Sequence, residues 1–299
     1  MKPAEGTDIS VIIPNLNTPI VPKTVVSILS QQSQYSFEVI VIGLDEDHLL
    51  DEFQSKIKFI DTEIPVPPGK ARNIGVSASK GCLLIFIDSD AVAQPDFLNL
   101  HFQKHQNHQA HLILGGSVTF PVENYFTLSD NIATFHEYMS HLPQGEKRMV
   151  PTVNMSILKE NFLLLGGFSD LPASEDTLFS LNAVKKHFKI LFDPGIKVEH
   201  LPPRSSLKEI FKHSYKLGYY SNFSNSIIER YPFLKFLTRS NIWLTIFSPI
   251  VALLIVLKIL FLEKLPIRYW LTLPLIFFLK CAWCVGTSQK YRRKVPIDC

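Results

Sequence analysis

Two acidic side chains follow an apolar run in the first third of the chain. The run spans residues 82–87, and Asp88 and Asp90 come directly after it. Alternation along an extended segment sends both side chains to the same side. Divalent ions such as Mg²⁺ and Mn²⁺ bind carboxylate oxygens together with phosphate oxygens and water, so the pair suits a metal-bound diphosphate. The alternative is that Asp90 caps a helix after Pro95.

The elements around this pair alternate between strand and helix patterns. Apolar runs at residues 9–13, 37–42 and 56–60 predict strands, and we expect the first to stop at Pro14. The fully apolar run before the acidic pair is typical of a central strand covered on both faces. This order predicts an α/β fold with a mostly parallel, Rossmann-like sheet, in which ligands bind outside the carboxyl ends of the strands. The acidic pair falls at such an end.

The composition excludes several classes of protein. The 299 residues are 46% hydrophobic and 19% charged, which excludes a disordered chain. With a net charge of +3 and no basic stripe or stacking platform, we expect no nucleic-acid partner. Four cysteines are too few for a disulfide framework, which favours a reducing compartment. We interpret Cys281 and Cys284 as packing residues of an apolar segment.

Two apolar segments near the C-terminus predict membrane helices. The first, about residues 242–262, approaches the ~20 residues that cross a bilayer, and Lys258 is its only charge. The second, about residues 268–287, carries Lys280 and either spans the membrane or lies in the interface. We expect a hairpin whose two lysines reach the headgroups. The alternative is a buried helical pair of a soluble domain.

Charges around these segments predict their orientation. Lys235 and Arg239 before them, with a basic tail from residue 290 onward, outnumber Lys264 and Arg268 in the connection. The positive-inside rule then places the domain and the tail in the cytoplasm. The N-terminus lacks an apolar stretch of the length a secretory signal needs. The sequence thus predicts a multi-pass protein of the cell membrane with a cytoplasmic soluble domain.

Several short motifs occur in a fixed order over about residues 8–200. They are residues 10–14 (SVIIP), 69–75 (GKARNIG), 88–90 (DSD), 166–168 (GGF) and 175–176 (ED). A lone DxD sequence is a weak signal, whereas several motifs in the right order are specific. This ordered set resembles a family 2 glycosyltransferase with the GT-A fold, in which the first three motifs belong to the nucleotide-sugar half and the last two to the acceptor side.

The resemblance also divides the chain. It implies a GT-A domain in residues 1–230, with a nucleotide-sugar half at about 8–110 and an acceptor half at about 111–205. A C-terminal α-helical membrane region follows at 231–299. The chain has no Q-x-x-R-W sequence of the kind found in processive synthases, which favours the addition of a single sugar.

The chemistry that the resemblance implies is transfer of a sugar from a UDP- or GDP-linked donor to a hydroxyl, with inversion at the anomeric carbon. Asp176 matches the general base that accepts the hydroxyl proton, and Glu175 is implied to orient the acceptor or a helix end. A diphosphate leaves well once its charge is neutralised, so one carboxylate base suffices. These residues also fit an acidic first helical turn with Ser174 as its N-cap.

The resemblance assigns further residues to a cation and to the donor. The implied metal ligands are Asp88, Asp90 and His200, with Mn²⁺ or Mg²⁺ as the cofactor. A histidine near a strand end is also commonly structural. The family's acidic residues after its second strand are missing, because Gly43 and Leu44 follow residue 42. The implied donor-binding residues are Pro14, Asn17, Arg72, Asn73, Asp88 and Arg204.

The segment before the apolar helices bears on the identity of the acceptor. Residues 206–239 mix aromatic and basic side chains, which is typical of an interfacial helix or of an amphipathic helix that packs on the catalytic domain. A site held near the bilayer motivates the hypothesis of a lipid- or polyprenyl-linked acceptor. The competing interpretation is a catalytically inactive relative that binds nucleotide sugar or scaffolds a partner at the membrane. A dinucleotide-dependent oxidoreductase is disfavoured because no G-x-G-x-x-G follows the first strand.

Overall fold

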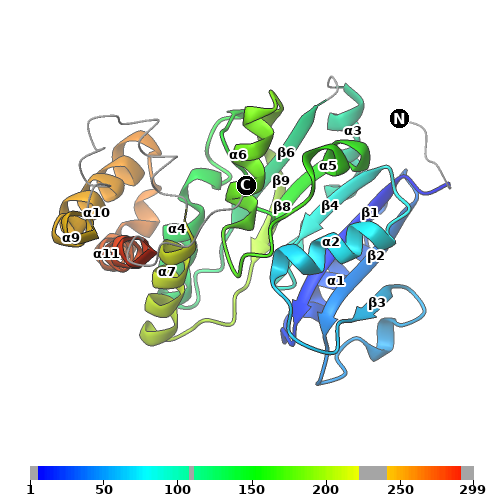
Figure 1. Cartoon of the computed structure of the whole chain (residues 1–299), viewed down its shortest axis with the longest axis horizontal. Coiled ribbons are helices and arrows are strands. Elements are labelled where there is room, and N and C mark those ends of the chain that lie inside the picture. Colours follow the sequence, from blue (N-terminus) through cyan, green and yellow to red (C-terminus); the bar gives the residue numbers. More distant parts are fainter. Residues whose placement is uncertain (1–5, 108–110, 222–240, 291–299) are drawn as a thin grey trace. The chain divides into compact units, whose positions relative to one another are not determined.

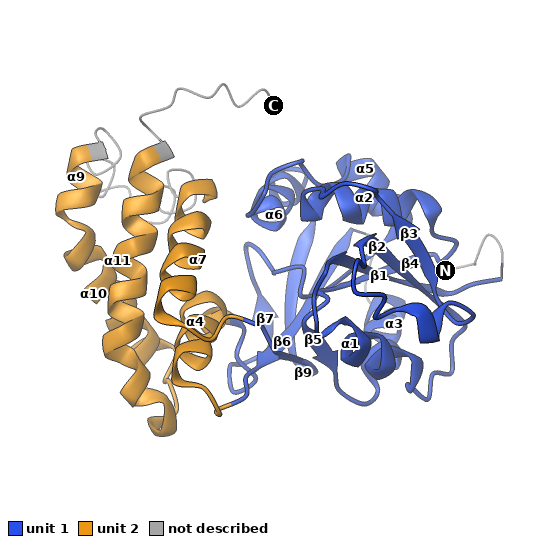
Figure 2. Cartoon of the chain, turned by 90° about the horizontal axis from the view of Figure 1, so that it is seen from below, with its two compact units in different colours: residues 1–121, 138–203 blue, residues 122–137, 204–299 orange. Residues whose placement is uncertain are grey.

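The chain forms two compact units in this computed structural model (Figure 2), which describes residues 6–107, 111–221 and 241–290. Unit 1 takes residues 1–121 and 138–203, and unit 2 takes residues 122–137 and 204–299. Residues that the sequence placed in the catalytic domain, 122–137 and those just after 204, thus cluster with the C-terminal helices. The domain limit at residue 230 stays a prediction.

Unit 1 holds, among its described residues, a nine-stranded sheet in the order β3-β2-β1-β4-β8-β6-β9-β5, with β7 paired to β9. The strands are β1 (Ile9–Leu16), β2 (Phe37–Leu44), β3 (Lys58–Asp61), β4 (Leu83–Ile87), β5 (Ala91–Ala93), β6 (Leu112–Thr119), β7 (Gly145–Glu146), β8 (Asn154–Leu158) and β9 (Lys189–His200). The helices are α1 (Val21–Leu29), η1 (Asp51–Phe53), α2 (Pro68–Ala78), α3 (Phe97–Asn107), α5 (Lys159–Leu165) and α6 (Glu175–Lys185).

The sheet is mixed, with most strands running in one direction. Strands β3, β2, β1 and β4 are parallel, and β6 is parallel to β9. Strand β8 lies antiparallel between β4 and β6, so those two strands share a direction. Helices α2, α5 and α6 cover one face and α1 and α3 the other (Figures 1 and 2). The predicted α/β class with a mostly parallel sheet is confirmed.

The apolar runs form the strands for the expected reason. All five residues of β4 are buried, as a strand with helices on both faces requires. The prediction that Pro14 ends the first strand is wrong, because β1 continues to Leu16. Its pairing with β4 stops at Ile12, so the missing N–H of Pro14 interrupts no bond on that side, while β2 stays paired on the other.

Unit 2 is helical in its described residues. Its elements are α4 (Tyr125–Phe135), the start of η2 (His136–Tyr138), α7 (Leu207–Tyr220), α9 (Asn241–Ile246), α10 (Ser248–Leu257), the π-helical turn η4 (Lys258–Leu262), η5 (Ile267–Thr272) and α11 (Leu273–Lys290). Helix α7 begins with a capping box, in which the Ser206 hydroxyl accepts the Glu209 backbone N–H and the Glu209 carboxylate accepts the Ser206 backbone N–H.

Among the described residues, one segment, Ile267–Gln289, is long and apolar enough to cross a membrane. The expectation of two spanning helices is therefore not supported. The first apolar segment is broken, because α9 ends at Ile246 and a new helix starts at Ser248 with proline in its first turn. Lys235, Arg239 and the basic tail at 291–299 lie outside the described residues.

The two lysines of the apolar segments are half-buried and bound to groups of unit 2, whereas we expected them to reach lipid headgroups. Lys258 forms ion pairs with Glu137 and Glu263, and Glu263 also pairs with His136 Nδ1 at 2.7 Å. Lys280 Nζ donates a hydrogen bond of 2.6 Å to the Ala133 carbonyl at the end of α4. Both lysines are thus neutralised or satisfied by groups inside unit 2.

Candidate active site

Three potential metal ligands meet at the ends of β4 and β9. Asp88 and Asp90 follow the last residue of β4, and His200 is the last residue of β9. One ligand atom from each lies within 4.8 Å of the others. Short β5 brings them together, because Ala91 pairs with His200, and His200 Nε2 lies 3.4 Å from Asp90 Oδ1.

This cluster has the donor set of a divalent cation site. Burial raises the pKa of Asp88, Arg72 opposes the rise, and the neighbouring Asp90 adds to it. Two carboxylates and one imidazole suit Mn²⁺ or Mg²⁺ in the company of phosphate oxygens. The alternative role of Asp90 as a helix cap is not observed, since Asp90 precedes β5 and α3 begins only at Phe97.

Arg72 connects the two acidic motifs. Arg72 lies on α2 and is almost fully buried, with 2% of the residue exposed. Nη2 lies 2.5 Å from Asp88 Oδ1, and Nη1 lies 2.5 Å from Glu175 Oε1. Both terminal nitrogens thus face carboxylates, and its Nε is buried without a partner among the described residues. The predicted contact of Arg72 with the donor stays a prediction.

The acidic pair opens helix α6 next to this arginine. Glu175 is buried and bonded to Arg72, whereas Asp176 is partly buried and accepts the Thr177 N–H at 2.7 Å. Burial, with Glu175 beside it, raises the pKa of Asp176 to about 7. Ser174 occupies the N-cap position but makes no side-chain capping bond, so the expected acidic first turn is present without the expected serine cap. A carboxylate with a pKa near neutrality is suited to accept and release a proton.

The side chain of Asn73 on α2 joins this helix to the glycine loop at residues 166–168. Asn73 Nδ2 donates to the Phe168 carbonyl at 2.8 Å, and Asn73 Oδ1 accepts the Phe168 N–H at 3.0 Å. Gly167 has a φ of 80°, and a Cβ there would meet Asn73 Oδ1 at 2.9 Å. Gly69 likewise leaves no room, because its Cβ would lie 2.3 Å from the Ser169 carbonyl oxygen. The Asn73 amide therefore fixes this loop, and its donor contact stays a prediction.

The turn after β1 is organised by asparagines. Asn15 Nδ2 donates to the Leu44 carbonyl at 2.7 Å, and Asn17 Oδ1 accepts the Glu46 N–H at 2.9 Å. Asn17 adopts a left-handed φ of 51°, which asparagine tolerates. Pro14 is half-buried at the same end of the strand. The structure thus places Pro14 and Asn17 at the carboxyl end of β1, the sheet edge where donor binding is predicted.

Arg204 belongs to unit 2, and its observed partner there is an aspartate. Arg204 Nε lies 2.9 Å from Asp130 Oδ2, and His213 Nδ1 lies 2.9 Å from Asp130 Oδ1. Burial acts to raise the pKa of Asp130, but bonds and charges from His213 and Arg204 hold it below its usual range. The predicted contact of Arg204 with the donor phosphates stays a prediction.

The sequence did not predict a buried polar network behind the sheet. His101 Nδ1 and Nε2 contact Ser156 Oγ at 2.8 Å and Asn154 Oδ1 at 3.0 Å. Asn154 Nδ2 then donates to the carbonyls of Ser117 and Ile196, both at 3.1 Å. Burial lowers the pKa of His101 to about 4, so it is neutral. This network fixes the backbone of β9 ahead of His200. The spacing of His101 and His105, which lie on one face of α3, is the one feature of the sequence that indicates the network.

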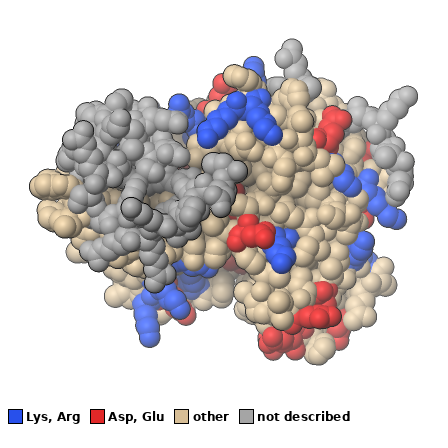
Figure 3. Space-filling view, viewed as in Figure 1, with Lys and Arg blue, Asp and Glu red and all other residues tan. Residues whose placement is uncertain are grey.

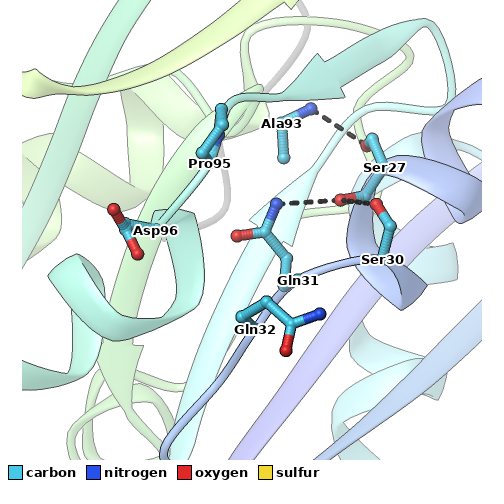
Figure 4. A pocket seen from close by; sticks show the side chains of 7 residues that line it. All are labelled: Ser27, Ser30, Gln31, Gln32, Ala93, Pro95 and Asp96. Atoms are coloured by element: carbon cyan, nitrogen blue, oxygen red, sulfur yellow. Dashed lines mark hydrogen bonds between the residues drawn. The ribbon is translucent and has the colours of Figure 1, made fainter.

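A separate hollow of about 350 Å³ lies beside α1 and the start of α3 (Figure 4). Its lining includes Ser27, Gln31 and Asp96 and none of the candidate site residues. The polar atoms here serve the backbone, since Ser27 Oγ accepts the Ala93 N–H and Gln31 Nε2 donates to the Gln94 carbonyl. The polar groups that line this hollow thus hold the loop before α3 in place, and the hollow is not part of the candidate site.

The family is shown by comparison with known proteins. Residues 10–162 match the model of the Glycosyl transferase family 2. The chain therefore belongs to glycosyl transferase family 2, as its motifs indicate. The curated relatives include an uncharacterized glycosyltransferase, YfnE, of Bacillus subtilis (strain 168), which is 30% identical over 224 residues and matches over 70% of this chain and 54% of its own length.

A second relative is a glucosyl-dolichyl phosphate glucuronosyltransferase of Haloferax volcanii, 27% identical over 162 residues, which cover 49% of this chain and 50% of that protein. The chain thus spans about half the length of these curated relatives. Among solved structures, GalNAc-T7 with UDP, GalNAc and Mn²⁺ gives a TM-score of 0.54 at 16% identity, covering 76% of this chain and 54% of that one. S. aureus TarS gives 0.52 at 15%, covering 96% and 91%. These likenesses show the GT-A fold.

Proposed function

We propose that this glycosyltransferase transfers one sugar from a nucleoside diphosphate to a hydroxyl with inversion at the anomeric carbon. The observation that carries the proposal is the cluster of Asp88, Asp90 and His200, joined through Arg72 to the acidic pair of α6. Donor-side and acceptor-side chemistry thus share one connected set of charges. An inactive scaffold has no need for a carboxylate whose pKa lies near 7 in this set.

Each residue of the set has a distinct task in the proposed reaction. Asp176 accepts the proton of the acceptor hydroxyl as that oxygen attacks from the face opposite the diphosphate. Arg72 is a positioning residue, because both of its terminal nitrogens hold carboxylates. Asp88, Asp90 and His200 would hold Mn²⁺ or Mg²⁺, which supplies neutralisation of the charge that develops on the leaving diphosphate.

The proposed acceptor is a lipid- or polyprenyl-linked hydroxyl. Its support is the apolar segment Ile267–Gln289 in the same chain and the likeness to the glucosyl-dolichyl phosphate glucuronosyltransferase of Haloferax volcanii. The basic residues that flank the apolar segments in the sequence favour attachment at the cytoplasmic face of the cell membrane. The donor base, UDP or GDP, is part of the proposal, with UDP supported by the fold neighbour that contains it.

A donor screen with the purified full chain tests this function. Nucleotide sugars are ranked by protection against thermal unfolding with Mn²⁺ and then with EDTA, and those that protect are assayed for release of nucleoside diphosphate. We expect one donor class to protect in Mn²⁺ only and to be turned over with acceptor present. If a donor binds but is turned over with no lipid-linked or soluble acceptor, the result would contradict the proposed enzymatic activity and support a catalytically inactive relative.

A further inference from the structure

The C-terminal helices expose an ordered apolar tip, defined here as residues 261–271. Among the described residues, side chains at this tip are some of the most exposed apolar groups, with Phe261 at 67%, Ile267 at 76% and Leu271 at 83%. The backbone beneath them is fixed, because Leu265 N donates to the Ile259 carbonyl at 3.2 Å and Trp270 Nε1 to the Leu265 carbonyl at 3.0 Å. Apolar groups held out in this way mark an interaction surface.

Basic side chains lie among these apolar groups. Lys264 and Arg268 are both exposed, and the Arg268 guanidinium stacks over the Tyr269 ring at 4.7 Å. Trp270 is half-exposed at 47% and has its indole N–H bonded, which leaves its apolar face outward. Apolar residues flanked by tryptophan and by positive charge fit the boundary of an anionic lipid surface.

The long helix α11 is a core helix of unit 2. Helices α4, α7, α9 and α10 all contact it. Each described residue from Leu279 to Gln289 is buried or half-buried. The contact with α7 is close, since a Cβ on Gly218 would lie 2.0 Å from the Trp283 carbonyl oxygen and one on Gly286 would lie 2.2 Å from that of Tyr215. Protein rather than lipid therefore surrounds this part of α11.

Crossing a bilayer would take polar groups of unit 2 into hydrocarbon. Helix α7, which packs along α11, exposes Lys208, Lys212 and Lys216. Lys258 is bound to Glu137 next to α4, and Lys280 is bound to the carbonyl of Ala133 in α4. If the apolar segments lay in the bilayer, α4 would therefore lie at the same depth in the membrane. Charged side chains at the centre of a bilayer are costly.

We propose that unit 2 is a monotopic anchor, which inserts the apolar tip into one leaflet of an anionic membrane and crosses it with none of its described helices. Insertion buries the exposed tip while Lys264 and Arg268 meet lipid phosphates. This inference deepens the proposed membrane attachment of the enzyme. Its test uses lipid binding and topology alone, so its failure is distinguishable from a failure of the proposed glycosyl transfer.

Vesicle partitioning of the purified full chain tests the surface. Sedimentation is measured with vesicles of phosphatidylcholine alone and with added phosphatidylglycerol. We expect Ile267→Asp combined with Leu271→Asp to lower partitioning at least about tenfold. Removal of each charge by Lys264→Gln or Arg268→Gln lowers it about fivefold on anionic vesicles. The matched control is Ile64→Asp, a 66% exposed position of unit 1, which is expected to change nothing.

Topology is tested in sealed membrane vesicles of both orientations with an impermeant maleimide. Arg268→Cys reports on the tip and Glu52→Cys, an exposed position, on unit 1, each against the parent chain as background. We expect position 268 to react from the same side as position 52, or to react only after detergent is added. Reaction from the opposite side alone would overturn the proposal. So would unchanged partitioning of the tip variants, or self-association through the tip without lipid binding.

Discussion

Arg72 and Glu175 lie 103 positions apart in the sequence and 2.5 Å apart in the fold, both buried. The same guanidinium holds Asp88, so one side chain joins the end of β4 to the start of α6. A planar guanidinium can serve two carboxylates at fixed angles, whereas an ammonium cannot reproduce that fork. The relative placement of the candidate metal site and the proposed base therefore depends on Arg72.

Replacement of this arginine by lysine is expected to damage both stability and turnover. Arg72→Lys leaves one buried carboxylate without its partner, which costs about 3–5 kcal/mol in the free energy of unfolding. Urea denaturation measures that loss, and kcat is expected to fall more than donor affinity. The control is Arg148→Lys at an exposed position of unit 1. If Arg72→Lys folds stably and weakens only donor binding, the arginine is a donor ligand instead.

The role of Asp176 is tested by turnover and its pH dependence. Asp176→Asn keeps the shape of the side chain but removes the base, so we expect kcat to drop by about 10²-fold or more while donor binding persists. Because burial places the pKa of Asp176 at about 7, the wild-type rate should fall about tenfold per pH unit below that value. A wild-type rate that stays flat from pH 5 to pH 8 would argue against this base.

The same pKa shift has a consequence for stability. Between the ordinary pKa of an aspartate and 7, the folded state keeps a proton that the unfolded state has lost, so stability falls as pH rises. Asp176→Asn removes this penalty. We expect its melting temperature to exceed that of the wild type at pH 8 and to match it near pH 3. Glu175→Gln serves as the comparison, since loss of the Arg72 ion pair lowers the melting temperature at pH 8.

The α/β order was predictable because apolar periodicity is local. Buried β4 with Asp88 and Asp90 after it follows from a few neighbouring residues. The Arg72 bridge was not predictable, because nothing near residue 72 indicates a partner at residue 175. Likewise, the partners of Asn73 are backbone atoms of Phe168, and a backbone atom leaves no mark on a sequence pattern.

The C-terminal segments show the limit of hydropathy. Residues 242–262 have the composition of a spanning helix, yet the chain breaks between α9 and α10, and Lys258 pairs with a glutamate more than a hundred positions away. Average hydropathy records neither the break nor the partner. It also gives the same value for a helix in lipid and for one packed against other helices, such as α11.

Metal dependence of UDP binding gives the most direct test of the candidate cluster of Asp88, Asp90 and His200. Asp90→Ala removes one carboxylate and His200→Ala the imidazole, so we expect UDP binding to lose its dependence on Mn²⁺ in the first and to weaken about tenfold or more in the second. Titration calorimetry with UDP is compared in Mn²⁺ and in EDTA. Glu52→Gln, an exposed acid of unit 1, controls for the loss of surface charge. Because the wild type in EDTA should match Asp90→Ala in Mn²⁺, the two losses must not add. Additive losses from EDTA and from Asp90→Ala, or UDP binding that still depends on Mn²⁺ in Asp90→Ala, would place the cation elsewhere.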